Sequence, residues 1–244
     1  MSDGLRPLAA VPRLLWLVLG LCLLLQVLWR LDQRNTAPQA QALPPPPSVA
    51  GARLASLGEP LAMARALLLH LQSFDDQPGV SLAWHALDYE RLAGWLETAQ
   101  ALDPRSQYAL AAASGVYAGV ADPARVRRML RFVADSFAAD PQHRWPAMAQ
   151  ATLTARHQLH DLPLARSYAR QLRLHATGPG VPAWVRQMEA FILEDMDELE
   201  SAQLVLGALM ASGQITDPNE LAFMARRLDQ MATRKREHAG NAGH

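Results

Sequence analysis

The chain has 244 residues, of which 50% are hydrophobic and 19% are charged, and its 23 basic side chains equal its 23 acidic ones. A chain without net charge lacks the attraction by which general nucleic-acid binders neutralise phosphates, so we expect no nucleic-acid partner. The single Cys22 excludes an internal disulfide and any zinc site built on a pair of cysteines. The length accommodates one domain with additional segments.

An apolar segment near the N-terminus predicts a membrane anchor. Residues 14–29 contain no charged side chain, and arginines flank them at Arg13 and Arg30. A bilayer core of about 30 Å needs ~20 mostly apolar residues in a helix. The two arginines can place their charged ends at the interfaces while their stems stay in the apolar region. We therefore predict a short leader at 1–12 and a transmembrane anchor at 13–31.

A cleaved signal peptide is the competing interpretation. Signal peptides need a small-x-small cleavage site directly after the apolar core. The nearest such site, Ala40-Gln41-Ala42, lies eleven residues beyond Trp29, so we expect the anchor to remain uncleaved. Arginines flank the anchor in nearly equal number on both sides, so the positive-inside rule does not decide the orientation. A short leader before one anchor favours an N-terminus in the cytoplasm.

Residues 32–58 predict a proline-rich linker. The run Pro44-Pro45-Pro46-Pro47 favours polyproline II, which extends about 3.1 Å per residue and makes no internal hydrogen bonds. We expect this stretch to be a stiff spacer that stays outside the core and holds the globular part away from the bilayer.

From 59 to 231 the apolar residues recur at helical spacing, which predicts an all-α domain of nine helices. In chain order the helices are Pro60–Gln72, Asp88–Leu102, Ser106–Val120, one opening at Asp122-Pro123, Trp145–Leu159, one after Asp161, Pro182–Asp195, one through Leu199 and Leu209, and Asp217–Met231. The fourth helix carries the stripe of one buried face, Val126, Met129, Leu130, Val133 and Phe137. Residues 232–244 predict a disordered basic tail.

Four prolines mark a repeat within this domain. Pro104, Pro141, Pro179 and Pro218 are separated by 37, 38 and 39 residues, and each interval contains one pair of predicted helices. A fixed spacing of about 34–47 residues is the signature of solenoids built from helix pairs.

The residues within these intervals resemble the tetratricopeptide repeat family. Asp161-Leu162-Pro163-Leu164-Ala165 is similar to the family's second-helix opening, with its alanine at the small position where paired helices touch. Glu198 to Ala202 repeats this arrangement 37 residues later. Ala190 matches the family's small residue on a first helix, whereas Leu153 stands where a small residue is expected. The intervals are longer than the family's 34 residues.

The resemblance covers 88–231 and implies a right-handed α-solenoid of antiparallel helix pairs, with the core buried between neighbouring pairs. As a whole, the chain resembles membrane-anchored repeat proteins of bacteria with GC-rich genomes, and Lys235 is its only lysine. That resemblance implies a single-pass protein of the bacterial inner membrane. The cytoplasmic N-terminus favoured by the short leader would place the C-terminal domain in the periplasm.

Two groups of side chains are candidate metal ligands. His157 and His160 share a helix face beside Asp161, but no third or fourth ligand converges on them from another element. The second group surrounds the long loop 73–87 and consists of His70, Asp75, Asp76 and His85. Long ordered loops are often functional, although Asp-Asp-Gln-Pro-Gly is also ordinary turn sequence.

Catalytic motifs are not found in the sequence. It contains no nucleophile elbow, no phosphate-binding glycine loop and no HExxH. We therefore expect no metal, no cofactor and no enzymatic activity. A metal-dependent or hydrolytic enzyme that uses the loop 73–87 remains an alternative.

The zero net charge conceals an uneven distribution. Nine arginines and three acids lie in 125–173, whereas six acids and no base lie in 189–200. Arg166, Arg170 and Arg173 share one helix face and could bind the carboxylates or phosphates of a partner. A solvated face with scattered surface ion pairs is the alternative interpretation.

The resemblance places the first helix of each pair on a concave binding face. The side chains it places there are Gln150, Thr154, His157 and Gln158 of the fifth helix and Trp184, Gln187, Phe191 and Glu194 of the seventh. Aromatic rings beside amides suit a bound peptide or helix. The spacing of Trp184 and Phe191 is equally compatible with a place in the core.

These features together predict a non-enzymatic, single-pass membrane protein that binds a protein partner in the membrane or periplasm. The expected role is that of a scaffold or assembly factor in the cell envelope. A structural bitopic subunit of a membrane complex, in which the anchor itself makes the specific contacts, is a further alternative.

Overall fold

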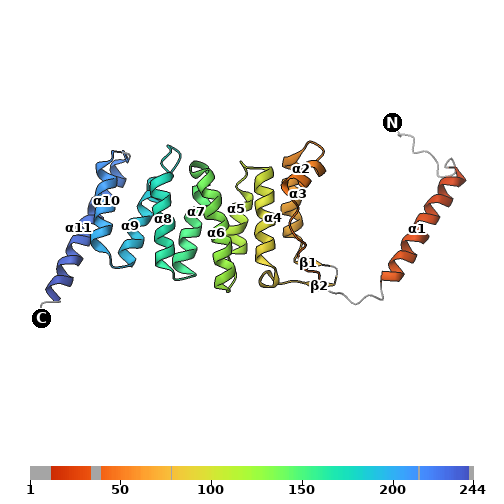
Figure 1. Cartoon of the computed structure of the whole chain (residues 1–244), viewed down its shortest axis with the longest axis horizontal. Helices are drawn as coiled ribbons and strands as arrows, with labels where there is room; N and C mark the ends of the chain where they lie inside the picture. The colour runs from red at the N-terminus through yellow and green to blue at the C-terminus, as the bar shows by residue number, and fades with distance from the viewer. Residues whose placement is uncertain (1–11, 34–39, 78, 214, 242–244) are drawn as a thin grey trace, which may run out of the picture. The chain divides into compact units, whose positions relative to one another are not determined.

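The computed structural model describes residues 12–33, 40–77, 79–213 and 215–241 (Figure 1). The predicted leader, except for its last residue, and the last three residues of the predicted tail lie outside the described residues. The chain divides into two compact units. The first consists of Met1–Gln41 with Gln77–Ser81, and the second of Ala42–Asp76 with Leu82–His244.

The first unit contains α1 (Arg13–Gln33), a helix of 21 residues. Its stretch Leu14–Leu31 has a mean hydropathy of 2.1, and no part of it is buried. A helix of this length and apolarity can cross a bilayer core. Among the described helices, no other passes this test alone, although the helices Val49–Ala55 and Pro60–Gln72 pass it as a pair with a bend of 111° between them. One N-terminal helix of membrane-spanning length is thus confirmed.

A short hairpin lies inside the predicted loop 73–87. It pairs β1 (Asp76–Gln77) with β2 (Val80–Ser81). The side chain of Gln77 accepts from the backbone N–H of Gln41 at 2.8 Å and donates to its carbonyl at 3.0 Å. Strands of two residues are too short to leave an alternating pattern in the sequence, so the sequence predicts only a loop here.

The second unit is built from α-helices joined by short turns. The helices are α2 (Val49–Ala55), α3 (Pro60–Gln72), α4 (Tyr89–Leu102), α5 (Tyr108–Ala111), α6 (Pro123–Ala139), α7 (Pro141–His157), α8 (Leu162–His175), α9 (Ala183–Asp195), α10 (Leu199–Ala211) and α11 (Pro218–Asn241). A 3₁₀ turn, η2 (Trp84–Ala86), precedes α4, and a π-helix, η3 (Ala112–Tyr117), continues α5. The all-α class is confirmed for the described residues.

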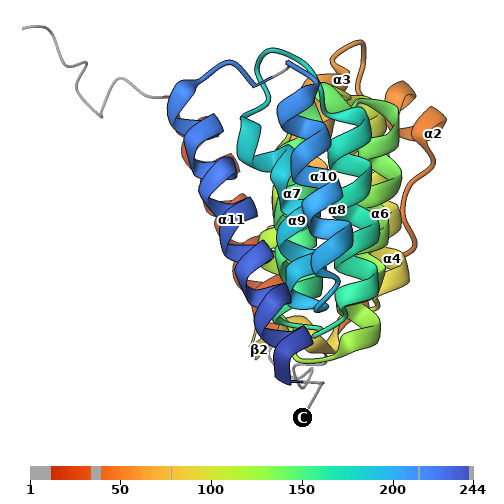
Figure 2. The same cartoon turned by 90° about the vertical axis from the view of Figure 1, so that its left-hand side faces the viewer.

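Helices that follow one another in sequence pack against each other from α6 to α11, and α3 packs against α4. Alternate helices also touch, since α4 lies beside α6, α5 beside α7, and α7 beside α9. Figure 2 shows the resulting arrangement in two layers, with α7 and α9 in one and α6, α8 and α10 in the other. This packing is compatible with a helical repeat fold.

The core contains the residues that the helical spacing predicts. All five residues of the predicted stripe on α6 are buried. Ala165 and Ala202, predicted at the contacts between paired helices, are fully buried, and so is Ala190. Small side chains at these positions let the helix backbones approach closely.

The departure at Leu153 has a structural cause. The turn between α7 and α8 is one residue longer than the turn between α9 and α10. The position equivalent to Ala190 is therefore Thr152, which is fully buried and donates its hydroxyl hydrogen to the Met148 carbonyl at 2.9 Å. Leu153 lies on the exposed face instead.

Equivalent turns precede α8 and α10. His160 and Asp197 both have positive φ, 52° and 60°, and each directly precedes the N-cap residue of the following helix. Positive φ is uncommon in residues with a Cβ atom. The N-cap Asp161 accepts a hydrogen bond from the backbone N–H of Leu164 at 2.9 Å. The recurrence of this backbone conformation 37 residues later is expected of a structural repeat.

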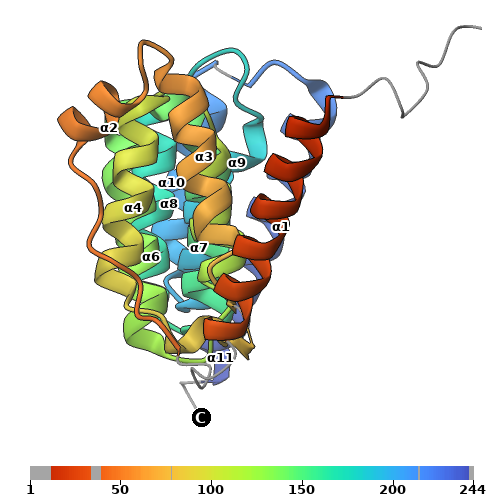
Figure 3. The same ribbon diagram turned by 90° about the vertical axis from the view of Figure 1, so that its right-hand side faces the viewer.

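The proline run is not a free spacer. Residues 42–48, which we call the proline strap, run along α4 as the coil beside it in Figure 3, and Leu43 is only 2% exposed. Three side chains of α4 donate hydrogen bonds to strap carbonyls: Arg91 Nη1 to Leu43 at 2.6 Å, Trp95 Nε1 to Pro44 at 2.9 Å and Thr98 Oγ1 to Pro47 at 3.0 Å. The prediction that this stretch stays outside the core is wrong, because an extended proline run leaves its carbonyls free to accept and α4 supplies donors.

The strap comes closest to α4 at Gly94. A Cβ atom on Gly94 would lie 2.7 Å from Cγ of Pro46, inside van der Waals contact. Glycine within a helix costs about 0.5–1 kcal/mol relative to alanine. Here the missing side chain makes room for the proline ring.

Several predicted helices of the domain have different bounds in the structure, and two of them differ most within the repeats. The predicted helix Ser106–Val120 is divided into α5 and the π-helix η3. The fifth predicted helix begins at Pro141 rather than Trp145, because proline is well tolerated in the first turn of a helix.

The predicted disordered tail is helical as far as Asn241, the end of α11. Arg234 forms an ion pair with Glu194 of α9 at 2.9 Å, and Lys235 forms one with Glu200 of α10. The composition of 232–244 indicates disorder, but it does not reveal that acids on two preceding helices bind its basic residues.

Candidate binding surface

Four aromatic rings connect the helices α7, α9 and α11. Trp145 meets Trp184 edge to face with ring centroids 5.8 Å apart, and Phe191 meets Phe223 in the same way at 6.3 Å. Trp184 and Phe223 are each 42% exposed. We call these four residues the aromatic surface. Large rings that neighbours hold in place lose little entropy on binding and suit apolar groups of a partner.

The side chains predicted for the groove on α7 divide into two kinds. Gln150 and His157 are exposed and available to a partner. Thr154 is buried within the helix layer. Gln158 donates from Nε2 to two backbone carbonyls, those of Ala118 and Val120, at 2.8 Å each. These last two residues therefore support the fold.

Two of the residues predicted for the groove on α9 bind within the chain. Gln187 is buried and donates from Nε2 to Glu220 of α11 at 2.8 Å. The Glu194 side chain is 7% exposed and forms ion pairs with Arg227 at 2.8 Å and Arg234 at 2.9 Å. These contacts hold α11 against α9. Because the Glu194 carboxylate is already paired with two arginines, its charge is not available to a partner.

The predicted basic face on α8 is largely neutralised by the same chain. Arg166 forms an ion pair with Glu198 at 3.0 Å, and Arg173 forms one with the buried carboxylate of Glu189 at 2.6 Å. Arg170 is exposed and makes no ion pair with a described residue. Of the three guanidinium groups predicted to bind phosphates or carboxylates of a partner, that of Arg170 is therefore the one without an ion pair to a described residue.

Arginines of one helix pair form ion pairs with acids of the neighbouring helix pair. Arg128 of α6 contacts Glu90 at 2.7 Å and Glu97 at 3.2 Å, both on α4. Arg156 of α7 contacts Asp195 at the end of α9. The partners lie 31 to 39 residues apart in sequence, close to the repeat period. Exposed pairs of this kind contribute about 0–1 kcal/mol each, so they act on register more than on stability.

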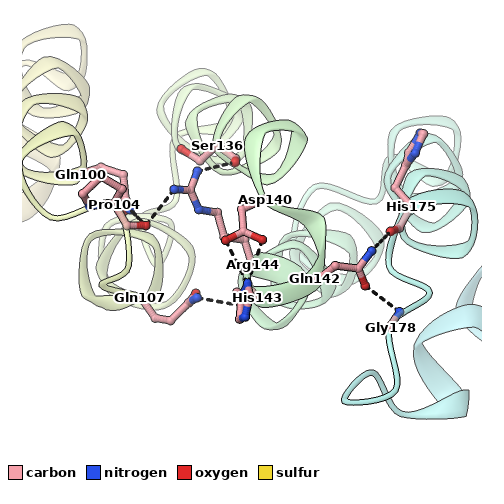
Figure 4. Close-up of polar contacts among 10 residues, drawn as sticks. All are labelled: Gln100, Pro104, Gln107, Ser136, Asp140, Gln142, His143, Arg144, His175 and Gly178. Atoms are coloured by element: carbon pink, nitrogen blue, oxygen red, sulfur yellow. Dashed lines mark hydrogen bonds and ion pairs between the residues drawn. The ribbon is translucent and has the colours of Figure 1, made fainter.

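Polar contacts also link the turns between helix pairs (Figure 4). The buried Arg144 donates to the carbonyls of Ser136 at 2.7 Å and Pro104 at 2.9 Å. Gln100 donates to the same Pro104 carbonyl at 3.1 Å. One carbonyl in the turn between α4 and α5 thus joins α4 to α7.

Two glutamines repeat this role further along the chain. Gln107 donates to the His143 carbonyl at 2.8 Å, and Gln142 donates to the His175 carbonyl at 2.7 Å (Figure 4). The side-chain oxygen of Gln142 accepts from the Gly178 N–H at 2.6 Å. Helical spacing does not predict these links. Two glutamines 35 residues apart, each shortly after one of the prolines that mark the repeat, are nevertheless a detectable signal.

The candidate metal ligands do not form a cluster. Among the described residues, no group of three or more His, Cys, Asp or Glu side chains is placed to hold a metal ion. The imidazole ring of His70 lies against two aromatic rings, with its centroid 5.1 Å from that of Trp95 and 5.7 Å from that of Phe74. Asp161 pairs with Arg127, and the hydrogen bond from that guanidinium holds the pKa of the Asp161 carboxyl below its usual value.

Two rings of the aromatic surface, those of Trp184 and Phe223, are 42% exposed, and the exposed Gln150 and His157 lie on α7, the helix that carries Trp145. The carboxylates of Glu189 and Glu194 on α9 are paired with arginines of the same chain. Recognition there would rest on apolar contact and amide hydrogen bonds. Comparison of the chain with protein-family models, with curated proteins and with solved structures gives no match.

Proposed function

We propose that this protein is a membrane-anchored helical-repeat protein that binds a protein partner through its aromatic surface. In this proposal it is a scaffold or assembly factor of the bacterial cell envelope and has no enzymatic activity. Helix α1 is the single anchor in the inner membrane, with bilayer contact through residues 13–31 and the repeat domain in the periplasm.

The proposal includes a right-handed solenoid similar to tetratricopeptide repeats. It is supported by the packing of consecutive helices and by the positive φ of His160 and Asp197 at equivalent turns. The buried small residues Thr152, Ala190 and Ala202 support it further, because they lie where the helices of a pair touch. Repeat stacks of this kind leave one extended face free for a partner.

One observation carries the binding proposal, and it is the exposure of Trp184 and Phe223. Each ring is fixed edge to face by a ring of the neighbouring helix, yet 42% of each remains exposed. Truncation of a central aromatic residue at an interface typically costs about 2 kcal/mol of binding free energy or more. Rings that are fixed and still accessible are the expected anchors of such an interface.

The proposal can be tested by recovery of the partner from native membranes with tagged full-length protein. The test variant combines Trp184→Ala with Phe223→Ala. The matched control is Leu174→Ala, which removes an apolar side chain 49% exposed on α8. We expect wild type and control to recover a stoichiometric partner, and the double variant to recover about tenfold less or lower. Equal recovery by all three proteins, with unchanged unfolding temperatures, would contradict the proposal.

A second variant separates a simple anchor from an anchor that makes specific contacts. Residues 13–31 are exchanged for an unrelated apolar helix of the same length. The proposal predicts that partner recovery is retained, because binding depends on the aromatic surface. Loss of the partner in this variant would favour a structural bitopic subunit instead.

A further inference from the structure

The turn between α2 and α3 exposes leucines to solvent. Leu54 near the end of α2 is 82% exposed, Leu57 in the turn is 93% exposed, and Leu61 at the start of α3 is 50% exposed. Among the described residues, Leu57 is the most exposed large apolar side chain and the only one exposed in a turn between two helices. Elsewhere in the described turns such side chains are at least partly buried, as at Val181 and Ile215.

The backbone fixes the shape of this turn without packing the Leu57 side chain. Ser56 Oγ donates to the Arg53 carbonyl at 2.6 Å, and the Glu59 N–H donates to the Ser56 carbonyl at 2.9 Å. Leu57 has a φ of 51°, and Gly58 follows with a φ of 96°. Positive φ is unfavourable for a bulky residue. Burial does not compensate for it at Leu57, so the turn holds an apolar side chain outward at a cost to the fold.

The shape of the turn favours a lipid surface over a folded protein as its partner. Figure 3 shows the turn between α2 and α3 at one end of the helices. A stable protein interface needs about 800 Å² on each partner, which three leucines around a single turn do not supply. A bilayer can surround a projecting turn, and apolar groups of interfacial segments enter it by about 5–10 Å.

The composition of α2 and α3 also suits contact with a bilayer. Together the two helices pass the test of length and apolarity for a membrane segment. Both are packed into the second unit, through Ala52 and Ala64, so only the turn between them is free to enter a bilayer. Residues 49–72 carry two arginines, Arg53 and Arg65, against one acid. Both arginines are exposed and can contact the phosphates of lipid headgroups.

The chain is long enough to bring this turn to the bilayer that α1 can cross. Ten peptide bonds connect Gln33, the last residue of α1, with Leu43, which is buried in the second unit. An extended chain of that length spans about 33–36 Å. The end of α2 lies at most about 30 Å from Leu43, at ~3.1 Å per residue of the strap and ~1.5 Å per helical residue. The covalent link makes contact with the bilayer intramolecular, so a weak affinity of the turn for lipid suffices.

We propose that the turn between α2 and α3 inserts Leu54, Leu57 and Leu61 into the interface of the bilayer that α1 crosses. The inference rests on the membrane anchor of the proposed function and goes beyond it, because it gives the repeat domain its own contact with lipid. A second contact restrains the orientation of the domain at the membrane, which the connection to α1 alone would leave free.

Depth-dependent quenching of a fluorescent label tests the proposal on the full-length protein in nanodiscs of phosphatidylcholine and phosphatidylglycerol. Some lipids carry a nitroxide quencher on either the upper or the lower part of an acyl chain. The environment-sensitive label nitrobenzoxadiazole is placed at native Cys22 in α1, at Ala55→Cys beside the leucines, or at Leu204→Cys on α10. Ala55 is exposed, and Leu204 is 75% exposed. The last two proteins also carry Cys22→Ala, so each protein has one label.

The three labels should respond differently. We expect the label at position 55 to be quenched most by the upper nitroxide and to emit at shorter wavelength than the label at position 204. The label at Cys22 should be quenched most by the lower nitroxide, because this residue lies in the middle of α1. The label at position 204 should not be quenched.

A double variant assigns the effect to the leucines. Leu54→Asn with Leu57→Asn makes the turn polar, and asparagine adopts positive φ more readily than leucine, so we expect no fall in the unfolding temperature. Quenching of the label at position 55 should be lost, whereas quenching at Cys22 should not change. Leu204→Asn is the matched control and should leave quenching at both positions as it is in the parent proteins.

Three results would overturn the proposal while Cys22 is still quenched. They are no quenching at position 55, equal quenching at positions 55 and 204, and unchanged quenching at position 55 in the double variant. Absence of quenching at Cys22 would contradict the anchor of the proposed function and this inference with it. The label at Cys22 therefore separates a failure of the anchor from a failure of the turn.

Discussion

The indole N–H of Trp95 donates to the carbonyl of Pro44 at 2.9 Å, across 51 residues of sequence. With the bonds from Arg91 and Thr98, this contact fixes the proline strap to α4. The segment between the membrane-length helix and the repeat domain is thereby part of the domain's packing. A change that loosens the strap should lower the stability of the domain.

Gly94→Ala tests this consequence. The new Cβ would lie 2.7 Å from Pro46 Cγ, and a proline ring cannot move aside without moving the strap. We expect the free energy of unfolding to fall by about 1–3 kcal/mol, since strap hydrogen bonds of about 1 kcal/mol each are strained or lost. Hydrogen exchange of the Trp95 indole N–H, which donates to the Pro44 carbonyl, should become faster.

Gly207→Ala is the control for Gly94→Ala. This glycine also lies within a helix, α10, but a Cβ added there meets no heavy atom within 4 Å. Its replacement should raise stability by about 0.5–1 kcal/mol through helix propensity. If Gly94→Ala raised stability by the same amount, the strap would not be held as the structure shows.

Glu194→Gln should loosen α11. The carboxylate is nearly buried between Arg227 and Arg234, so its neutralisation leaves two arginines without their partner. We expect a loss of about 2–3 kcal/mol, somewhat less than for a fully buried pair because the arginines are partly exposed. Urea unfolding and hydrogen exchange along α11 measure the effect. Glu200→Gln removes an exposed ion pair with Lys235 and should leave both measurements unchanged.

His160→Gly should stabilise the protein. His160 has a φ of 52°, where a residue with a Cβ atom is strained and glycine is not. Glycine also has a larger chain entropy in the unfolded state, which offsets part of the relief of strain. We expect the free energy of unfolding to rise by about 0.5–1 kcal/mol in total. His157→Gly, three residues earlier at the last residue of α7, where φ is not positive, should instead lower stability by about 0.5 kcal/mol. The opposite signs in thermal unfolding would confirm the turn geometry, and equal signs would contradict it.

Alkaline pH should destabilise the fold through two tyrosines. Burial raises the pKa of Tyr89 and of Tyr117 to about 12, from 10.0 for a free side chain. Because the folded-state pKa is raised, the contribution of each neutral tyrosine is fully present below pH 10 and is lost as the pH rises to about 12. Ultraviolet absorbance of tyrosinate should show these two groups ionising late, together with the loss of helical circular dichroism. Ionisation of all four tyrosines near pH 10 in the folded protein would contradict this.

Much of the fold is predictable because local signals define the helices. The predicted bounds Pro60–Gln72 are those of α3, and the Asp122-Pro123 signal places the start of α6, where the Asp122 carboxylate accepts from two backbone N–H groups. The strap is not predictable in this way. Its docking depends on donors of α4 that lie 48 to 51 residues away and line up with its carbonyls only after folding.

The binding surface is predictable in part for a similar reason. Helical spacing and the resemblance place Trp184, Gln187, Phe191 and Glu194 together, and the structure does bring rings to the surface there. The sequence does not indicate that α11 binds Gln187 and Glu194, because those contacts reach 33 residues along the chain.

The central claim, that the aromatic surface is where a partner protein binds, is tested most directly by site-specific photocrosslinking in native membranes. A benzoylphenylalanine residue replaces Trp184 in one full-length protein and Leu174 in another. We predict one discrete crosslinked species of higher mass from position 184 and none from position 174. Identical crosslinking patterns from the two positions, or no crosslinked partner from position 184, would contradict the claim.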